Sequence, residues 1–335
     1  MLGSHEPLRV RLPARDDRIV WLLAQRIVAA VPVVFGVSLV SFIVVDLLPG
    51  NVAHSLLGTD ASAEQIAQYE AELGLDRPAV DRYFEWLSAV LEGDLGRSLA
   101  SGQAVNNVIA ERAAVTVELA VLSLALSVVL ALTTAVLAAH NPGGWADGLC
   151  RAISMVGISV PNYVLAIVLV LVFSVNLRLF PSIGFVPLEQ GVLRNLQSLV
   201  LPAVALGLPF FCVYSRFLRS DLVDQIEGAG YILTAKAKGL GPWRILLRHA
   251  LPNSLIGMVT LVGLNFGPLL GGTVIVEQIF SLPGIGHLLI QAAHTRDIPV
   301  VQAIVLIVAA ATVAATLLTD VLHMLIDPRI RYARA

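Results

Sequence analysis

Charged residues are scarce in this sequence, since 14% of its 335 residues are Asp, Glu, Lys or Arg. A water-soluble domain typically carries about a quarter of its residues charged. Hydrophobic residues make up 57% of the chain, and the mean hydropathy is +0.81. This composition indicates that lipid is the main solvent. The formal net charge of −2 gives no basic surface, so we expect no nucleic acid partner.

Motifs of catalysis and metal binding are also absent from the sequence. Cys150 and Cys212 are the only cysteines, and because no CxxC pair exists we expect both to be small buried side chains. No GxxxxGK[ST] phosphate loop occurs, so the chain cannot bind ATP by that route. The histidines are scattered and form no HExxH pair. We therefore expect a non-catalytic chain with no metal or cofactor of its own.

Long apolar runs are what the sequence does contain. A helix needs about 20 mostly apolar residues to cross a bilayer. The sequence predicts about six such spans, at residues 20–48, 114–139, 152–176, 197–215, 254–278 and 299–324. The fourth run contains Pro202, Gly207 and Pro209, so we expect it to face protein instead of lipid, because neighbours must satisfy the freed backbone groups.

Basic residues indicate the orientation, because Lys and Arg gather on the cytoplasmic side. A cytoplasmic N-terminus puts fifteen of the 22 Lys and Arg residues inside. The sequence thus predicts a multi-pass protein of the cytoplasmic membrane with both termini in the cytoplasm. The expected division is an N-terminal extension at 1–19, a membrane domain at 20–327 and a cytoplasmic tail at 328–335.

The acidic segment 49–112 is expected outside the membrane. Within it, residues 62–92 read as amphipathic helix that opens at the capping residue Ser62 and breaks between Gly74 and Pro78. This region is either a compact cap on the outer face or a solvated connector.

Residues 216–252 are expected in the cytoplasm and carry six basic side chains. Tyr231–Lys238 predicts a short helix that ends at Gly239 in the left-handed conformation, and Pro242 starts the next helix. Two helices around a glycine corner would suit docking to a cytosolic partner. An ordinary basic loop that obeys the charge rule is the alternative.

Small residues and helix breakers mark two further places. Gly263, Gly267 and Gly271 recur every four residues, which lets another helix approach closely, either from a second subunit or from this chain. The stretch Phe280-Ser-Leu-Pro-Gly-Ile-Gly286 predicts a turn or re-entrant segment at the outer surface.

The ionisable residues of the spans are expected near the ends of their runs. These are Asp46, Glu118, Glu277 and Asp320, for which interfacial solvation favours structural roles. A transporter driven by protons or sodium would carry a carboxylate near the midplane. Such a secondary transporter, or a membrane scaffold without transport, remains the alternative to a chain that takes its energy from a partner.

Several ordered motifs resemble a known family over residues 26–331. They are Asp46-Leu-Leu-Pro-Gly50, Leu73-Gly-Leu-Asp-Arg-Pro78, Gly93-Asp-Leu-Gly-Arg-Ser-Leu99, Thr234-Ala-Lys-Ala-Lys-Gly-Leu240, Leu247-Arg-His-Ala-Leu251, Val276-Glu-Gln-Ile-Phe280 with Pro283-Gly-Ile-Gly286, and Asp327-Pro-Arg-Ile-Arg331. Together they resemble the inner-membrane permease subunits of ABC importers for dipeptides, oligopeptides and nickel.

The resemblance implies an all-α type I importer permease fold with an extracytoplasmic helical loop and a cytoplasmic coupling helix. The family's Glu-Ala-Ala signature maps onto Leu233–Ala235 and Gly239, with Leu233 in place of the acidic residue and His249 where isoleucine is usual. The implied contacts with an ATPase are Thr234, Ala235, Lys236, Ala237, Lys238, Gly239 and Leu240.

The remaining implied sites lie on other faces of the chain. We expect Leu282, Pro283, Gly284, Ile285 and Gly286 at the outer gate and binding-protein contact, and Gly263, Gly267 and Gly271 against a partner permease. The substrate-lining residues are not identified by the sequence.

The resemblance also implies the assembly and its energy source. The implied partners are a second homologous permease, two cytosolic ATPase subunits that hold ATP and Mg²⁺, and an extracytoplasmic substrate-binding protein. Transport of short peptides by alternating access is the expected function, with nickel or another small solute as the alternative.

Overall fold

The computed structural model describes residues 15–46, the isolated positions 62, 64, 65, 68 and 71, and residues 77–326. The expected N-terminal extension and C-terminal tail fall mainly or wholly outside these residues, as do the motif at 327–331 and most of 47–76. Over the described ranges the chain is helical, and the only β pairing is the isolated bridge between Arg97 and Ala104. The all-α fold predicted from the sequence is confirmed.

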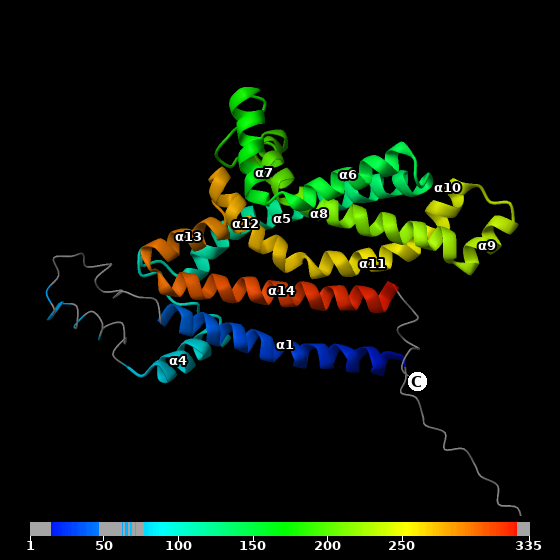
Figure 1. The fold of residues 1–335 in the computed structure, drawn as a ribbon. Coiled ribbons are helices and arrows are strands. Elements are labelled where there is room, and N and C mark those ends of the chain that lie inside the picture. Colours follow the sequence, from blue (N-terminus) through cyan, green and yellow to red (C-terminus); the bar gives the residue numbers. More distant parts are fainter. Residues whose placement is uncertain are drawn as a thin grey trace, which may run out of the picture.

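Long apolar helices run side by side along one axis (Figure 1). Five in the described residues are long and apolar enough to cross a membrane. They are α1 (Arg15–Asp46), α5 (Val105–His140), α8 (Val192–Gly228), the continuous run of α10 (Pro242–Ile245), η3 (Leu246–Ala250) and α11 (Leu251–Leu264), and α14 (Ile298–Ile326).

Two further apolar segments are bent, the first within the predicted span 152–176 and the second at the turn predicted over Phe280–Gly286, which is thus confirmed. Helix α6 (Trp145–Ser159) turns by 102° into α7 (Asn162–Leu169) and η1 (Val170–Asn176). The break falls where Pro161 lacks a backbone N–H and restricts the residue before it. Helix α12 (Phe266–Phe280) turns by 77° into α13 (Ile285–Thr295), and the predicted run 254–278 is divided at Asn265.

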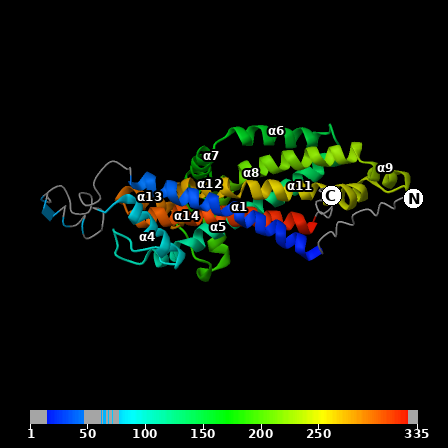
Figure 2. The ribbon, with the colours of Figure 1, turned by 90° about the horizontal axis from the view of Figure 1, so that it is seen from below.

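The helices and their connections define two ends of the bundle. Helices α4 (Ala79–Leu91) and α13 lie at one end, called here the elbow end, and α9 (Gly230–Ala237) lies at the other, called the corner end (Figure 2). The start of α1 and the end of α14 both lie at the corner end, where Arg26 pairs with Asp320 at 3.3 Å. The described residues thus hold five to seven candidate crossings, a range that includes the predicted six.

The closest helix pair at the centre is α5 against α8. Five small side chains on α5 form a stripe with a four-residue period, and all are almost fully buried: Ser123, Ser127, Ala131, Ala135 and Ala139. Opposite them, a Cβ on Gly207 of α8 would lie 2.7 Å from the backbone oxygen of Ser123. Small residues on both sides let the two backbones touch, which is how helices pack in lipid.

Helix α8 is straight enough to remain one element despite Pro202 and Pro209 inside it. In its most apolar stretch 56% is buried inside the protein, the highest share among the five long helices. This confirms the expectation that the proline-containing run faces protein. Cys150 and Cys212 are also buried, as predicted, and the Cys212 sulfur occupies the space beside Gly157 that a Cβ would need.

The segment before α5 begins with a capping box. The Gln65 backbone N–H donates to Ser62 Oγ at 3.2 Å, and the Ser62 N–H donates to Gln65 Oε1 at 2.9 Å, so the predicted cap at Ser62 is confirmed. Helix α4 then lies on α1, with Tyr83 stacked edge-on against Phe42. Between α7 and α8 lies the short η2 (Leu188–Gln190).

Candidate functional site

The corner end carries the helix, glycine and helix that the sequence predicts. Helix α9 ends at Ala237, Gly239 has a φ of +73°, and Pro242 opens α10. A φ in this range favours glycine, because a Cβ would crowd the following carbonyl. The local structure of this corner, residues 229–245, is thus confirmed.

The corner has one face packed and one face exposed. Ile232 is fully buried and Ala235 is 4% exposed, and both belong to the core formed with α5 and α8. Leu240 packs against the same core. Of the residues expected to contact an ATPase, Ala235 is therefore a packing residue and Leu240 is largely one, because an i, i+3 pair with Ile232 turns Ala235 inward. The exposed face holds Leu233, Thr234, Lys236, Ala237, Lys238 and Gly239.

Two contacts hold the corner rigidly to the bundle. The Trp243 ring of α10 stacks on the His140 ring at the end of α5, with centroids 3.9 Å apart and an interplanar angle of 17°. Lys236 Nζ donates to the Ile226 carbonyl at 3.1 Å, near the end of α8. A force applied to the exposed face of the corner would therefore reach α5 and α8 directly.

At the opposite end, a buried carboxylate organises the turn between α12 and α13, called here the elbow, residues 277–287. Glu277 is fully buried. Its carboxylate accepts hydrogen bonds from Thr116 Oγ1 at 2.6 Å, from the His287 N–H at 3.0 Å and from the Gly286 N–H. Thr116 Oγ1 also accepts the Ile285 N–H at 2.8 Å. A carboxylate at a helix N-terminus satisfies the free N–H groups and the helix dipole of α13.

Close contacts explain why Gly284 and Gly286 of the elbow are glycines. A Cβ on Gly284 would collide with the Glu277 carboxyl group, and a Cβ on Gly286 would lie 2.5 Å from the Val274 Cα. Glu277 was expected to be solvated near a span end. The structure corrects this, because the elbow folds α13 back over it.

Most of the predicted outer-gate residues are buried within the elbow. Leu282 is fully buried, Ile285 is 8% exposed, and Gly284 and Gly286 are buried. In this conformation they form the frame of the elbow and cannot themselves offer a surface to a binding protein. Pro283 is half-buried and Ser281 is exposed.

A second buried carboxylate ties the loop 93–104, called here the outer loop, to the turn before α14. Asp297 is 3% exposed, and it accepts hydrogen bonds from the Ser98 hydroxyl and from the Leu99 N–H at 3.0 Å. Within the loop, Gly93 and Gly96 have φ values of +89° and +86°. The motif Gly93–Leu99 is thus a compact turn fastened to the elbow end.

The regularly spaced glycines lie mainly against α14 of the same chain. A Cβ on Gly263 would collide with the Thr319 side chain, and one on Gly267 would lie 2.9 Å from Thr312 Cγ2. Packing within the chain therefore accounts for these two glycines without a partner permease. Gly271 has open space beside it, and its contact with a partner subunit stays a prediction.

One buried ion pair was missed by the sequence reading. Asp147, at the start of α6, is fully buried and receives two hydrogen bonds from Arg219 of α8, Nε at 2.7 Å and Nη2 at 2.9 Å. The Gly143 N–H adds a third at 2.9 Å. The separation of 72 residues between the partners gives no periodic signal, so only the tertiary structure reveals the pair.

Family models identify the class of protein that carries these features. Residues 127–332 match the binding-protein-dependent transport system inner membrane component, and residues 19–120 match the N-terminal part of the membrane component of such systems. The chain belongs to this family. It is a multi-pass, non-catalytic transport subunit, and the ATPase of such a system is a separate chain.

Similar proteins extend the match along nearly the whole permease. The chain is 40% identical over 311 residues to a putative peptide transport system permease protein of Brucella abortus. The alignment covers 93% of this chain and 99% of the relative. It is 35% identical over 308 residues to the glutathione transport system permease protein of Escherichia coli K12, with 92% and 98% covered.

A solved structure supports the fold of this permease independently. The MetNI methionine ABC transporter, solved in inward-facing conformations, contains a chain that superposes with a TM-score of 0.53 at 17% identity. The match covers 66% of this chain and 96% of that one. The likeness bears on the fold, and it supports the type I importer permease fold that the motifs implied.

Proposed function

We propose that this permease subunit imports short peptides across the cytoplasmic membrane as part of an ABC importer. The observation that carries the proposal is the similarity to permeases for peptides and for glutathione, itself a small peptide, over more than nine-tenths of the chain. Nickel and other small solutes remain the competing substrates.

In this proposal, ATP and Mg²⁺ bind only to two cytosolic ATPase subunits. The exposed face of the corner, which includes Leu233 at 60% exposure and Lys236 one turn further along α9, docks into a cleft of one of them. Apolar residues accompanied by polar ones are a common composition for a protein interface. The contacts of the corner with α5 and α8 would carry motion from the ATPase into the helices that line the bundle centre.

The elbow end faces the extracytoplasmic side in this proposal. A binding protein would deliver the substrate there, to the surface near the outer loop and Pro283, and a second homologous permease would complete the pathway. The corner end, together with the start of α1 and the end of α14, faces the cytoplasm. Closure of the ATPases would then alternate access between the two ends.

Reconstitution tests this function directly. The permease, purified with its partner permease and ATPase subunits, is placed in proteoliposomes with the binding protein, and uptake of labelled di- and tripeptides is measured with and without ATP. We expect ATP-dependent peptide uptake and no uptake of nickel. Uptake that persists without the ATPase subunits would instead indicate a secondary transporter.

The corner is tested by Gly239→Asp, which places a side chain in the positive-φ position and a negative charge on the basic face. We expect the variant to insert normally but to lose peptide uptake and ATPase co-purification. Gly102→Asp is the matched control for ATPase co-purification, because Gly102 has a φ of +71° in the outer loop, away from the corner. Full uptake by the Gly239→Asp variant would refute the docking role.

A further inference from the structure

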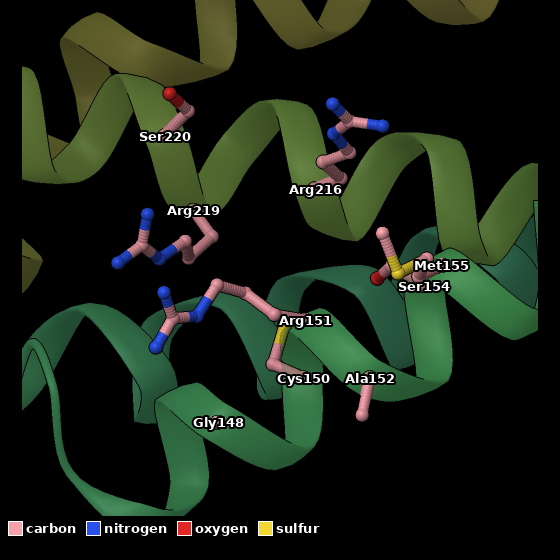
Figure 3. Close-up of a pocket in the computed structure, with 9 residues that line it drawn as sticks. All are labelled: Gly148, Cys150, Arg151, Ala152, Ser154, Met155, Arg216, Arg219 and Ser220. Atoms are coloured by element: carbon pink, nitrogen blue, oxygen red, sulfur yellow. The ribbon is translucent and has the colours of Figure 1, made fainter.

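A cavity of about 440 Å³ opens between α6 and α8 towards the corner end of the bundle. Three arginines line it, Arg151 from α6 and Arg216 and Arg219 from α8, together with Ser154 and Met155 (Figure 3). None of the transport features described above uses this cavity.

The cavity carries an excess of positive charge. Asp147 is the carboxylate that neutralises part of it, through Arg219 and, at 3.5 Å, through Arg151. In the described part of the chain Arg216 has no ion pair, and its side chain is exposed. Three guanidinium groups against one carboxylate leave two positive charges for a ligand. Guanidinium groups bind phosphate and carboxylate oxygens in a fork geometry.

A buried hydroxyl in the wall of the cavity points to the same kind of ligand. Ser154 is 1% exposed, yet its Oγ has no hydrogen-bond partner among the described residues. Buried polar groups are nearly always paired, and an unpaired one usually marks a missing water, ion or ligand. An anion that contacts the arginines and accepts from Ser154 Oγ would satisfy it.

Beside the cavity, the exposed face of α6 is apolar. Met155 is 75% exposed, Val156 65% and Leu149 51%. These side chains lie next to the arginines on the same helix, so a ligand with a charged head and an acyl tail would match both parts. Basic pockets between membrane helices near the cytoplasmic surface bind the headgroups of anionic lipids.

We propose that this cavity binds the phosphate of an anionic phospholipid from the cytoplasmic leaflet, with the acyl chains along α6. The choice of leaflet rests on the proposed function, which places the corner end in the cytoplasm. The headgroup phosphate binds Arg151 and Arg216, Ser154 donates a hydrogen bond to it, and the lipid thereby joins α6 to α8. Arg219, which Asp147 holds in place, lines the same cavity.

Native mass spectrometry of the full chain tests the proposal without the rest of the transporter. The chain in detergent is titrated with phosphatidylglycerol and with phosphatidylcholine. We expect phosphatidylglycerol to bind more tightly, and Arg151→Gln with Arg216→Gln to weaken it by at least about 100-fold, since hydrogen bonds between charged groups are stronger than neutral ones. Ser154→Ala should weaken it by roughly tenfold.

Arg194→Gln is the matched control, because Arg194 is an exposed arginine at the other end of α8. It should leave the affinity unchanged. Equal affinity in the double variant and the control would overturn the proposal. Displacement of the lipid by millimolar inorganic phosphate would also overturn it, because the site would then be one for soluble anions.

The assembled transporter provides a second readout. A photoreactive phosphatidylglycerol should crosslink to α6 peptides in the complete complex. If the partner permease covers the cavity instead, the crosslink appears only in the isolated chain and the proposal fails. Because lipid binding is measured on the chain alone, failure of peptide uptake would leave this result standing and would count against the transport function only.

Discussion

Thr116→Val removes one hydroxyl from the elbow without changing the shape of the side chain. That hydroxyl donates to Glu277 at 2.6 Å and accepts the Ile285 N–H at 2.8 Å. Thr116 is 6% exposed, so water cannot easily replace it. The variant therefore leaves the first N–H of α13 unpaired. It also removes one hydrogen-bond donor from the buried Glu277 carboxylate, which no water can replace.

The expected magnitude follows from these two hydrogen bonds. A buried N–H left without a partner costs about 1–3 kcal/mol, and a hydrogen bond to a charged group contributes about 1.5–3 kcal/mol. Because the two share one hydroxyl and are not additive, we expect about 3 kcal/mol for local opening of the elbow. At about 1.4 kcal/mol per tenfold, the open fraction rises by roughly 100-fold.

Cysteine labelling measures that open fraction. Leu282 is fully buried in the elbow, and the native Cys150 and Cys212 are buried, so Leu282→Cys supplies one protected thiol. The rate of maleimide labelling in nanodiscs is proportional to the open fraction when reclosing is fast. We expect labelling about 100-fold faster when Thr116→Val is added.

Thr133→Val is the matched control on the same helix. The Thr133 hydroxyl is exposed, and within the described part of the chain it donates to the Val129 and Leu130 carbonyls of α5 alone. Its loss should leave the labelling rate within about threefold, since such local bonds contribute little. If Thr116→Val and Thr133→Val label at the same rate, the Glu277 network does not hold the elbow and the reasoning is refuted.

Three further experiments test the packing of the chain. Gly286→Ala should lower the thermal midpoint by several degrees, because its Cβ meets the backbone at 2.5 Å, whereas Gly271→Ala, with open space beside it, should not. Asp147→Asn should reduce the yield of folded protein, because it leaves the Arg219 charge without its partner. Adding Arg219→Gln should restore part of the yield, and a double variant with a lower yield than Asp147→Asn would contradict this. Asp297→Asn should expose the outer loop to limited proteolysis, and unchanged cleavage would show that the loop is held elsewhere.

Patterns confined to a short stretch of sequence predicted the local structure well. The apolar runs gave the crossings, because a span needs only a length of hydrophobic residues. The capping box at Ser62, the left-handed Gly239 and the helix start at Pro242 followed from local backbone chemistry. Each of these signals is contained in fewer than about 30 residues, so no tertiary information was needed.

The features that depend on distant partners required the tertiary structure. Glu277 reads as an interfacial carboxylate until Thr116, 161 residues away, is seen to bind it. Asp147 likewise reads as an ordinary first-turn acid until Arg219 of α8 reaches it. A sequence records how apolar a segment is, and hence that it enters lipid, but which buried polar groups satisfy one another is decided only when the helices pack.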